Sequence, residues 1–243
     1  MSTVAVIGCT GQVGSHLLST LLGLDTIKAV HTISRRSPRV SAPKLSAHVE
    51  SDTARWISTL AAITPPPDVV FSALGTTREQ AGGAANQWKI DHDCEIAPSP
   101  YCAIHYHSLH SADITKTWSE RRVSEIRPHP RRQVLWLRVM KQGVENAVQS
   151  LGFEQQAIVL RPGLILSERE RENQGASFLK SLIRGIGGVS QAWHDNLGQE
   201  ADTIARAAVK AALLSTESDK APGRYWVVER QDIVSLGRDK WEF

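Results

Sequence analysis

The sequence predicts an α/β fold in which one parallel β-sheet is covered by helices on both faces. An apolar run of strand length, "VAVIG", lies near the start of the 243-residue chain and leads into a glycine-rich turn. Segments with the pattern of strands then alternate with segments of helical periodicity, which is the order that builds a parallel sheet. The composition of 41% hydrophobic and 22% charged residues is typical of a globular protein with a sizeable core.

The first 75 residues supply most of the predicted sheet. After "VAVIG", apolar side chains recur at helical spacing from Val13 to Leu22, which predicts a helix. "IKAVHTISRR" predicts the second strand and "LSAHVESD" the third. "TARWISTLAAI" is amphipathic enough for the next helix, and "PPPDVVFSALG" predicts a fourth strand after a proline stop.

The segment at 95–139 breaks this pattern. It is rich in proline and histidine, it has no long helical stripe, and only "YCAIHYHSL" within it resembles a strand. We therefore expect one domain over residues 1–243, with an irregular segment at 95–139 where a fifth strand would follow. Regular patterns then return as helices in "QVLWLRVMKQGVENAVQSLGF", "GASFLKSLIRGIGG" and "EADTIARAAVKAALLS", and as strands in "QAIVLRPGLIL" and "RYWVVE".

Composition excludes several classes of protein. The three cysteines, Cys9, Cys94 and Cys102, have no CxxC spacing and predict no disulfide framework. We expect neither a secretory signal nor a membrane-spanning helix, because no basic n-region precedes "VAVIG" and no apolar run reaches about 18 residues. The net charge is +3, and the basic residues concentrate at 116–141. Without a recognisable nucleic-acid motif, we interpret that window as a solvated loop and consider nucleic-acid binding unlikely.

Gly8, Gly11 and Gly14 form a GxxGxxG motif between the first predicted strand and its helix. At such a corner the backbone turns tightly and lets a diphosphate approach the amide groups at the helix N-terminus, where partial positive charge collects. A β-carbon at these positions would obstruct the approach. The motif therefore predicts a dinucleotide site, to which the intervening Thr10, Gln12 and Val13 also belong.

The second predicted strand ends in Ser34, Arg35 and Arg36. A carboxylate at this position accepts hydrogen bonds from a ribose 2′-hydroxyl, whereas arginine pairs with a 2′-phosphate. The arginines favour NADP over NAD, although two surface arginines after a strand are the alternative interpretation. Further predicted contacts are Asp52 after the third strand, on the adenine side, and the backbone after the fourth strand at Ala73, Leu74 and Gly75.

Several motifs together resemble one family, the atypical short-chain dehydrogenases that include the fungal found-in-mitochondrial-proteome NAD(P)-binding proteins and the Tat-interacting oxidoreductase-like proteins. The motifs are "VIGCTGQVG", "TISRR", "FSALGTT", "WKIDHD", "MKQGVENAVQSLGF" and "VLRPGLILSERE". The resemblance implies a Rossmann-like doubly wound sheet, NADP(H) as cofactor and a small-molecule substrate of unknown identity. For the fungal branch it also implies a peripheral place on the mitochondrial outer membrane; without that membrane contact the expected location is cytoplasmic.

Proteins that resemble this chain carry a tyrosine four residues before a helical lysine. The two side chains then share one helix face, so the ammonium lowers the pKa of the phenol that passes a proton to the substrate. Lys141 in "VMKQG" matches the lysine, but Leu137 occupies the tyrosine position. The resemblance further places Pro162 and Gly163 near the nicotinamide. We therefore expect cofactor binding with severely impaired hydride transfer.

Alternatives remain open for the segment at 95–139 and for the function. The segment has either diverged, so that it replaces the usual fifth strand and catalytic region, or its translation includes a wrong reading frame or splice boundary. The protein is accordingly an impaired oxidoreductase or a non-catalytic nucleotide sensor or scaffold at the outer membrane. Cys102, His105, His107 and His110 are metal-ligand types, but they have no second cluster, so we expect no metal site.

Overall fold

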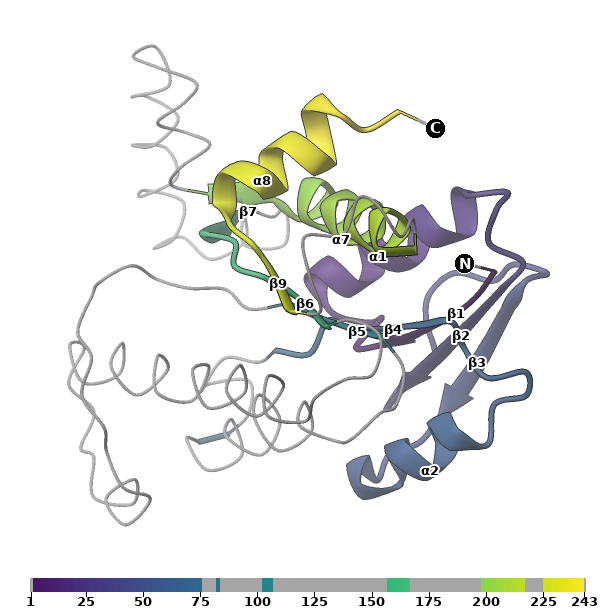
Figure 1. The fold of residues 1–243 in the computed structure, drawn as a ribbon. Helices are drawn as coiled ribbons and strands as arrows, with labels where there is room; N and C mark the ends of the chain where they lie inside the picture. The colour runs from purple at the N-terminus through teal and green to yellow at the C-terminus, as the bar shows by residue number, and fades with distance from the viewer. Residues whose placement is uncertain are drawn as a thin grey trace.

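The computed structural model describes residues 2–75, 82–83, 102–106, 157–166, 198–216 and 225–242. Within these ranges, seven strands form one parallel sheet in the order β3-β2-β1-β4-β5-β6-β9 (Figure 1). The strands are β1 Thr3–Ile7, β2 Ala29–Ser34, β3 Leu45–Val49, β4 Val69–Ser72, β5 Cys102–Tyr106, β6 Ala157–Leu160 and β9 Tyr225–Val228. Two further strands, β7 Leu164–Leu166 and β8 Gly198–Glu200, pair in parallel with each other.

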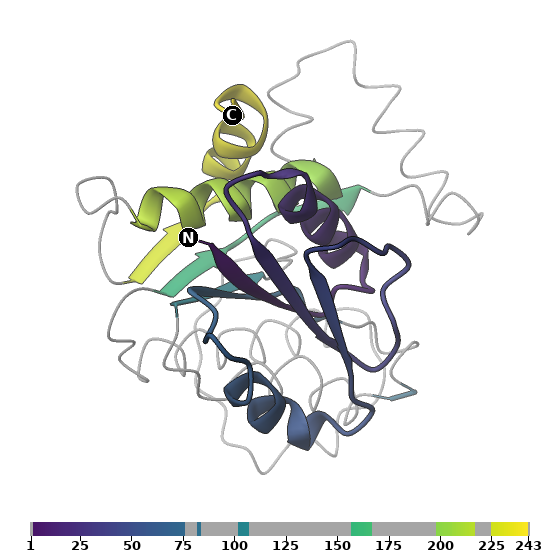
Figure 2. The same cartoon turned by 90° about the vertical axis from the view of Figure 1, so that its right-hand side faces the viewer.

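Helices lie on both faces of the sheet (Figure 2). One face carries α1 Gln12–Gly23 and α7 Ala201–Thr216, with α8 Arg230–Val234 and the π-helical segment η5 Ser235–Asp239 continuing beside α7. The other face carries the short 3-10 helix η1 Thr53–Arg55 and α2 Trp56–Ala61. None of the helices in the described ranges is long and apolar enough to cross a membrane.

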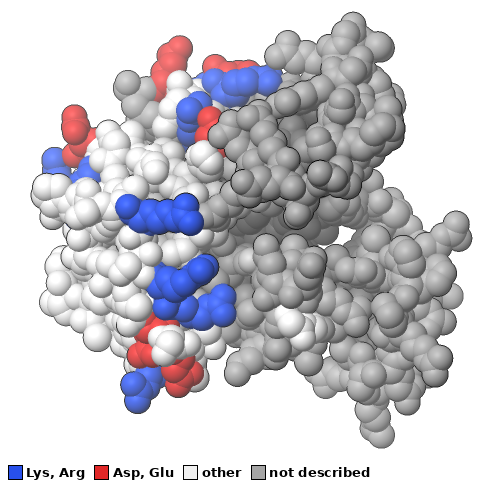
Figure 3. Space-filling view, turned by 180° about the vertical axis from the view of Figure 1, so that it is seen from behind, with Lys and Arg blue, Asp and Glu red and all other residues white. Residues whose placement is uncertain are grey.

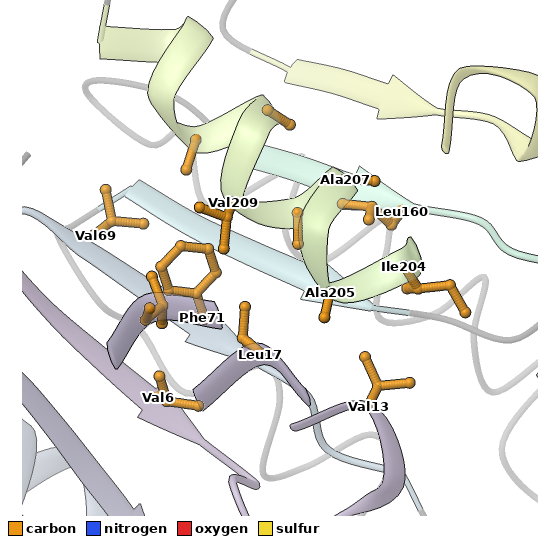
Figure 4. Packing of buried hydrophobic residues seen from close by; sticks show 14 of the residues in the cluster. Val6, Val13, Leu17, Val69, Phe71, Leu160, Ile204, Ala205, Ala207 and Val209 are labelled. Carbon is orange, nitrogen blue, oxygen red and sulfur yellow. The ribbon is translucent and has the colours of Figure 1, made fainter. Parts of the chain in front are cut away.

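The two faces have separate hydrophobic cores. Toward α1 and α7, the side chain of Phe71 on β4 lies among those of Leu17 and Val209, and all three are buried (Figure 4). Toward α2, Ile33 and Val70 pack with Trp56. Burial on both faces of the sheet explains why its central strands β1, β4 and β6 are almost continuously apolar.

The structure confirms the predicted parallel sheet with helices on both faces, and it corrects one expectation. Cys102–Tyr106 forms β5 and pairs in parallel with both β4 and β6, so a fifth strand is present within the segment expected to replace it. β8, α8 and η5 were not predicted. The predicted helices at 133–153 and 175–188, and the rest of 95–139, lie outside the described residues.

One polar pair joins β2 to the edge strand β3. His31 and His48 are half-buried, and their Nδ1 and Nε2 atoms lie 3.2 Å apart. The ring planes differ by only 22°. Burial of the imidazole, and then repulsion from His48, lowers the pKa of His31 below its ordinary value. The folded protein therefore favours neutral His31.

We expect the free energy of unfolding to decrease as the pH falls from about 8 toward 5.5. Unfolded His31 regains its ordinary pKa of about 6.5 and binds a proton that folded His31 resists. The contribution of neutral His31 to the free energy of unfolding is therefore fully present above about pH 6.5, and it is lost as the pH falls below that value. Urea unfolding at several pH values should show a weaker dependence in His31→Gln, whereas His16→Gln, on the exposed side of α1, should behave like the parent protein. Equal pH dependence in both variants would contradict this explanation.

Candidate functional site

The corner between β1 and α1 is built from backbone atoms in close contact. Gly8 has φ +82°, a conformation that favours glycine, and its carbonyl oxygen accepts a 2.9 Å hydrogen bond from the Gly11 amide. A Cβ added to Gly8 would lie 2.7 Å from the carbonyl oxygen of Ala73, in the segment that follows β4. The first turn therefore requires glycine for both its dihedral angle and its space.

Gly14 lies in the first turn of α1, directly against this corner. A Cβ there would collide with the carbonyl oxygen of Gly8, and one on Gly11 would lie 3.2 Å from the same oxygen. The N-cap residue, Gly11, offers no side-chain cap, and the first turn holds no acidic residue. The amide groups at this helix end are thus left without a side-chain acceptor, as in a site that receives an anion.

Two buried polar atoms near the corner suit a ligand. Nε2 of Gln12, the first residue of α1, and Oγ of Ser72, the last residue of β4, have no hydrogen-bond partner, and within the described ranges only Thr32 Oγ1 shares this state. Ser72 pairs with Ile7 across the β1–β4 ladder, so it lies beside the start of the glycine turn. Buried polar groups normally have partners. These atoms, together with the space that glycine leaves, fit a polar ligand such as a dinucleotide.

Thr10 and Val13 differ in position. Thr10 is half-buried in the turn, whereas Val13 is buried and belongs to the core between α1 and α7 (Figure 4). Val13 is also a predicted cofactor contact, and its side chain lies in the apolar cluster. Any part it has at the site is through its backbone.

Ser34 connects the glycine turn to the end of β2. Its side chain is 2% exposed, and its Oγ donates a 2.7 Å hydrogen bond to the carbonyl of Arg36. The thiol of Cys9, next to Gly8, lies 3.6 Å from the same Oγ and donates to it. Arg35 and Arg36 are exposed just beyond this turn. A buried hydroxyl thus fixes the backbone that presents the two guanidinium groups.

Asp52, predicted on the adenine side, has a local structural role. Its Oδ1 accepts a 3.0 Å hydrogen bond from the Ala54 amide and so caps the 3-10 helix η1. The residue is exposed. Capping occupies one carboxylate oxygen and leaves the other at the surface.

The segment after β4 lies against the glycine turn. The Ala73 amide donates a 2.9 Å hydrogen bond to the carbonyl of Ile7, which continues the β1–β4 ladder past Ser72. Leu74 points into the core beside α2, and the position of a Cβ on Gly75 has no neighbour within 4 Å. The backbones of Ala73 and Leu74 therefore both lie against Gly8, and the Leu74 side chain also contributes to packing.

Pro162 and Gly163 are buried in the turn between β6 and β7. The Gly163 amide donates a 2.6 Å hydrogen bond to Oε1 of Gln199, a residue of β8 that is only 3% exposed. Because the carboxyl ends of parallel strands meet at one edge of the sheet, this turn and the glycine turn lie at the same edge. Sequence reasoning missed Gln199, since no periodicity distinguishes a buried glutamine from a surface one.

Lys141 and Leu137 lie outside the described residues, as do His107 and His110. Cys102 and His105 are both on β5. In the described ranges, no group of three or more His, Cys, Asp or Glu side chains is arranged to hold a metal ion. Figure 3 shows the molecule from behind the view of Figure 1. On the described part of this face, Lys and Arg side chains lie in several separate groups, most of them with Asp or Glu beside them.

Comparison with known proteins agrees with this fold. The model of the NAD dependent epimerase/dehydratase family matches residues 4–96, which include the glycine turn, β2 and β4. "Protein fmp52-2, mitochondrial" from Neosartorya fischeri is 46% identical over 242 residues, covering 100% of this chain and 99% of that protein. "Protein FMP52, mitochondrial" from Chaetomium globosum is also 46% identical, over 244 residues that cover all of both chains.

Solved structures share the fold at low sequence identity. The Bordetella bronchiseptica enzyme WbmF in complex with NAD+ has a TM-score of 0.60 at 12% identity, covering 94% of this chain and 72% of WbmF. A short chain dehydrogenase/reductase from Saccharomyces cerevisiae has a TM-score of 0.60 at 13% identity, covering 97% of this chain and 99% of that one. Both similarities show a common architecture.

Proposed function

Because this chain belongs to the FMP52 family of fungal proteins, we propose that it is a single NADP(H)-binding domain over residues 1–243. The observation that carries the proposal is the corner at Gly8 and Gly14. The positive φ of Gly8 and the backbone atoms beside both glycines exclude side chains there, and the adjoining N-terminus of α1 has no side-chain cap. The matching epimerase/dehydratase family is NAD dependent, and the similar WbmF structure holds NAD+. These likenesses support a nicotinamide dinucleotide as the ligand.

Each end of the described site has a distinct part in binding. Amide groups in the first turn of α1 receive the diphosphate, with Gln12 Nε2 as an additional donor. Arg35 and Arg36, presented by the Ser34 turn, pair with the 2′-phosphate of the adenosine ribose. Lys141 holds the nicotinamide ribose, by resemblance to the family. The arginines are the reason for proposing NADP ahead of NAD.

The proposed activity is binding with little or no turnover. When bound, NADPH supplies a hydride, and reduction of a carbonyl also requires a proton donor next to the substrate oxygen. The alkyl side chain of Leu137 has no proton to donate, although the family places a tyrosine at this position. A nucleotide sensor or scaffold is the second candidate, and the same observation, that Leu137 has no proton to donate, supports it.

The purified protein tests this proposal directly. NADPH should bind with a measurable Kd in isothermal titration, whereas a panel of aldehydes and ketones should give no NADPH oxidation above that of Lys141→Ala. Absence of NADPH and NADH binding would refute the dinucleotide site. A clear reductase rate that Lys141→Ala does not change would refute two parts of the proposal. Lys141 would then not hold the nicotinamide ribose, and Leu137 would not prevent turnover.

Selectivity for the phosphorylated cofactor gives a sharper prediction. We expect Arg35→Ala with Arg36→Ala to weaken NADPH binding about 10- to 100-fold, because charge-assisted hydrogen bonds contribute about 1.5–3 kcal/mol. NADH affinity should change little. Lys28→Ala is a suitable control, since Lys28 precedes β2 at the opposite edge of the sheet. Equal losses for NADPH and NADH would show that the arginines do not recognise the 2′-phosphate.

The relatives are named as mitochondrial proteins, and we propose that this chain associates peripherally with the mitochondrial outer membrane. Cell fractionation should recover it with mitochondria, and alkaline carbonate should release it from them. Its presence only in the cytosolic fraction would contradict this location.

A further inference from the structure

We propose that Gln199 is a positioning residue for the nicotinamide end of the dinucleotide site. It acts through the turn formed by Arg161, Pro162 and Gly163, which joins β6 to β7. The inference rests on the proposed function, since it assumes that a nicotinamide dinucleotide occupies this edge of the sheet. It assigns a role to a side chain on β8, more than thirty residues after that turn in the sequence.

The first step is the hydrogen bond itself. Oε1 of Gln199 lies 2.6 Å from the Gly163 amide nitrogen, and both residues are buried. Buried amides normally have acceptors, and a neutral carboxamide supplies one without bringing a charge into the core. The length and neutrality of glutamine therefore suit this position.

The second step is the rigidity of the element that carries Gln199. Gln199 pairs with Ile165 in the β7–β8 ladder, directly beyond the turn that its side chain contacts. The next element, α7, starts at Ala201, which is 3% exposed and belongs to the core shared with α1. The side chain thus extends from a fixed backbone on a structured element.

The third step is a second attachment of the same turn. The Arg161 amide donates a 3.0 Å hydrogen bond to the carbonyl of Val228, and its guanidinium lies 2.9 Å from a carboxylate oxygen of Glu229. These contacts hold the start of the turn to the end of β9. Gln199 holds the other end of the turn from β8, so the position of Pro162 between them is determined from both sides.

The strand order separates this turn from the adenosine half of the site. β4 and β5 lie between β1 and β6, and Arg35 and Arg36 follow β2 on the far side of β1. A change confined to the Arg161–Gly163 turn should therefore affect the nicotinamide half of the ligand and leave the adenosine half bound as before. This difference distinguishes positioning from a general effect on folding.

The experiment compares Gln199→Leu with the parent protein and with Gln231→Leu, a matched change at an exposed position of α8. Titrations use NADPH and adenosine 2′,5′-bisphosphate, which lacks the nicotinamide half. We expect Gln199→Leu to weaken NADPH about tenfold, the effect of one lost hydrogen bond, and to leave the bisphosphate within about twofold. Gln231→Leu should change neither affinity.

Other outcomes have separate meanings. Equal loss of both ligands in Gln199→Leu, or no loss of either, would overturn the positioning role. If Gln199→Leu does not fold, Gln199→Asn keeps the carboxamide on a shorter side chain and should give the same selective loss of NADPH; equal effects on both ligands would again refute the role. Failure of the parent protein to bind either ligand would instead refute the proposed function.

Discussion

Replacing Gly14 by alanine is expected to abolish NADPH binding and to lower the free energy of unfolding by about 1–3 kcal/mol. The added Cβ would meet the Gly8 carbonyl oxygen, so either α1 or the glycine turn must shift. Because the proposed diphosphate site is formed by this backbone, a shift of even part of an ångström removes its geometry. Isothermal titration measures the binding, and urea unfolding measures the stability.

Gly23→Ala is the matched control on the same helix. Gly23 is the last residue of α1, and a Cβ there has no neighbour within 4 Å. We expect unchanged NADPH affinity and equal or slightly greater stability, since alanine in a helix is favoured over glycine by about 0.5–1 kcal/mol. NADPH affinity in Gly14→Ala equal to that in Gly23→Ala would exclude the corner as the ligand site.

Phe71→Ala is expected to destabilise the protein by about 3–5 kcal/mol. The ring is 1% exposed, and it extends from β4 toward α1 and α7, whose side chains surround it (Figure 4). Removal deletes a large buried apolar group and leaves a cavity that the helices fill only in part. Because β4 leads into Ala73, beside the glycine turn, looser packing here should also weaken nucleotide binding. Denaturant unfolding and NADPH titration give the two readouts.

Ile57→Ala provides the comparison for that variant. Ile57 on α2 is 41% exposed, and its loss should change the free energy of unfolding by no more than about 0.5 kcal/mol. A similar cost for both substitutions would mean that the cluster around Phe71 does not form the core of the folded protein.

The strands that the sequence patterns revealed most clearly are those that consist almost entirely of apolar residues. β1 and β4 are buried on both faces and appear as apolar runs, while α7 repeats alanine and larger apolar residues at helical spacing. β5, with the sequence "CAIHY", mixes polar and apolar residues, and its place follows from pairing with β4 and β6. The three-residue strand β8 is too short to produce any period.

The C-terminal helix was missed for a related reason. Gly237 lies within η5, and glycine in a potential helix argues against that assignment. In the structure, a Cβ at this position would collide with the carbonyl oxygen of Thr203 on α7. Glycine is needed there for a close approach between two backbones, a requirement visible only once the helices are packed together.

How much of the candidate site could be predicted depended on the kind of residue involved. Gly8, Gly14 and the arginines after β2 were predicted because their chemistry and spacing are distinctive. The roles of Ser34 in fixing the Arg36 backbone and of Gln199 in holding Gly163 come from contacts between distant parts of the chain. Such contacts have no local pattern, so only the folded arrangement reveals them.

The strand order also has a consequence for biosynthesis. β1, β2 and β4 occur within the first 72 residues, but β6 acquires its neighbour on the outer side only when β9, at residues 225–228, has been made. During translation the half of the sheet formed by β1 to β4 is available to collapse while the edge at β6 is still unpaired. Nascent chains should therefore complete the sheet only after almost the whole polypeptide has left the ribosome.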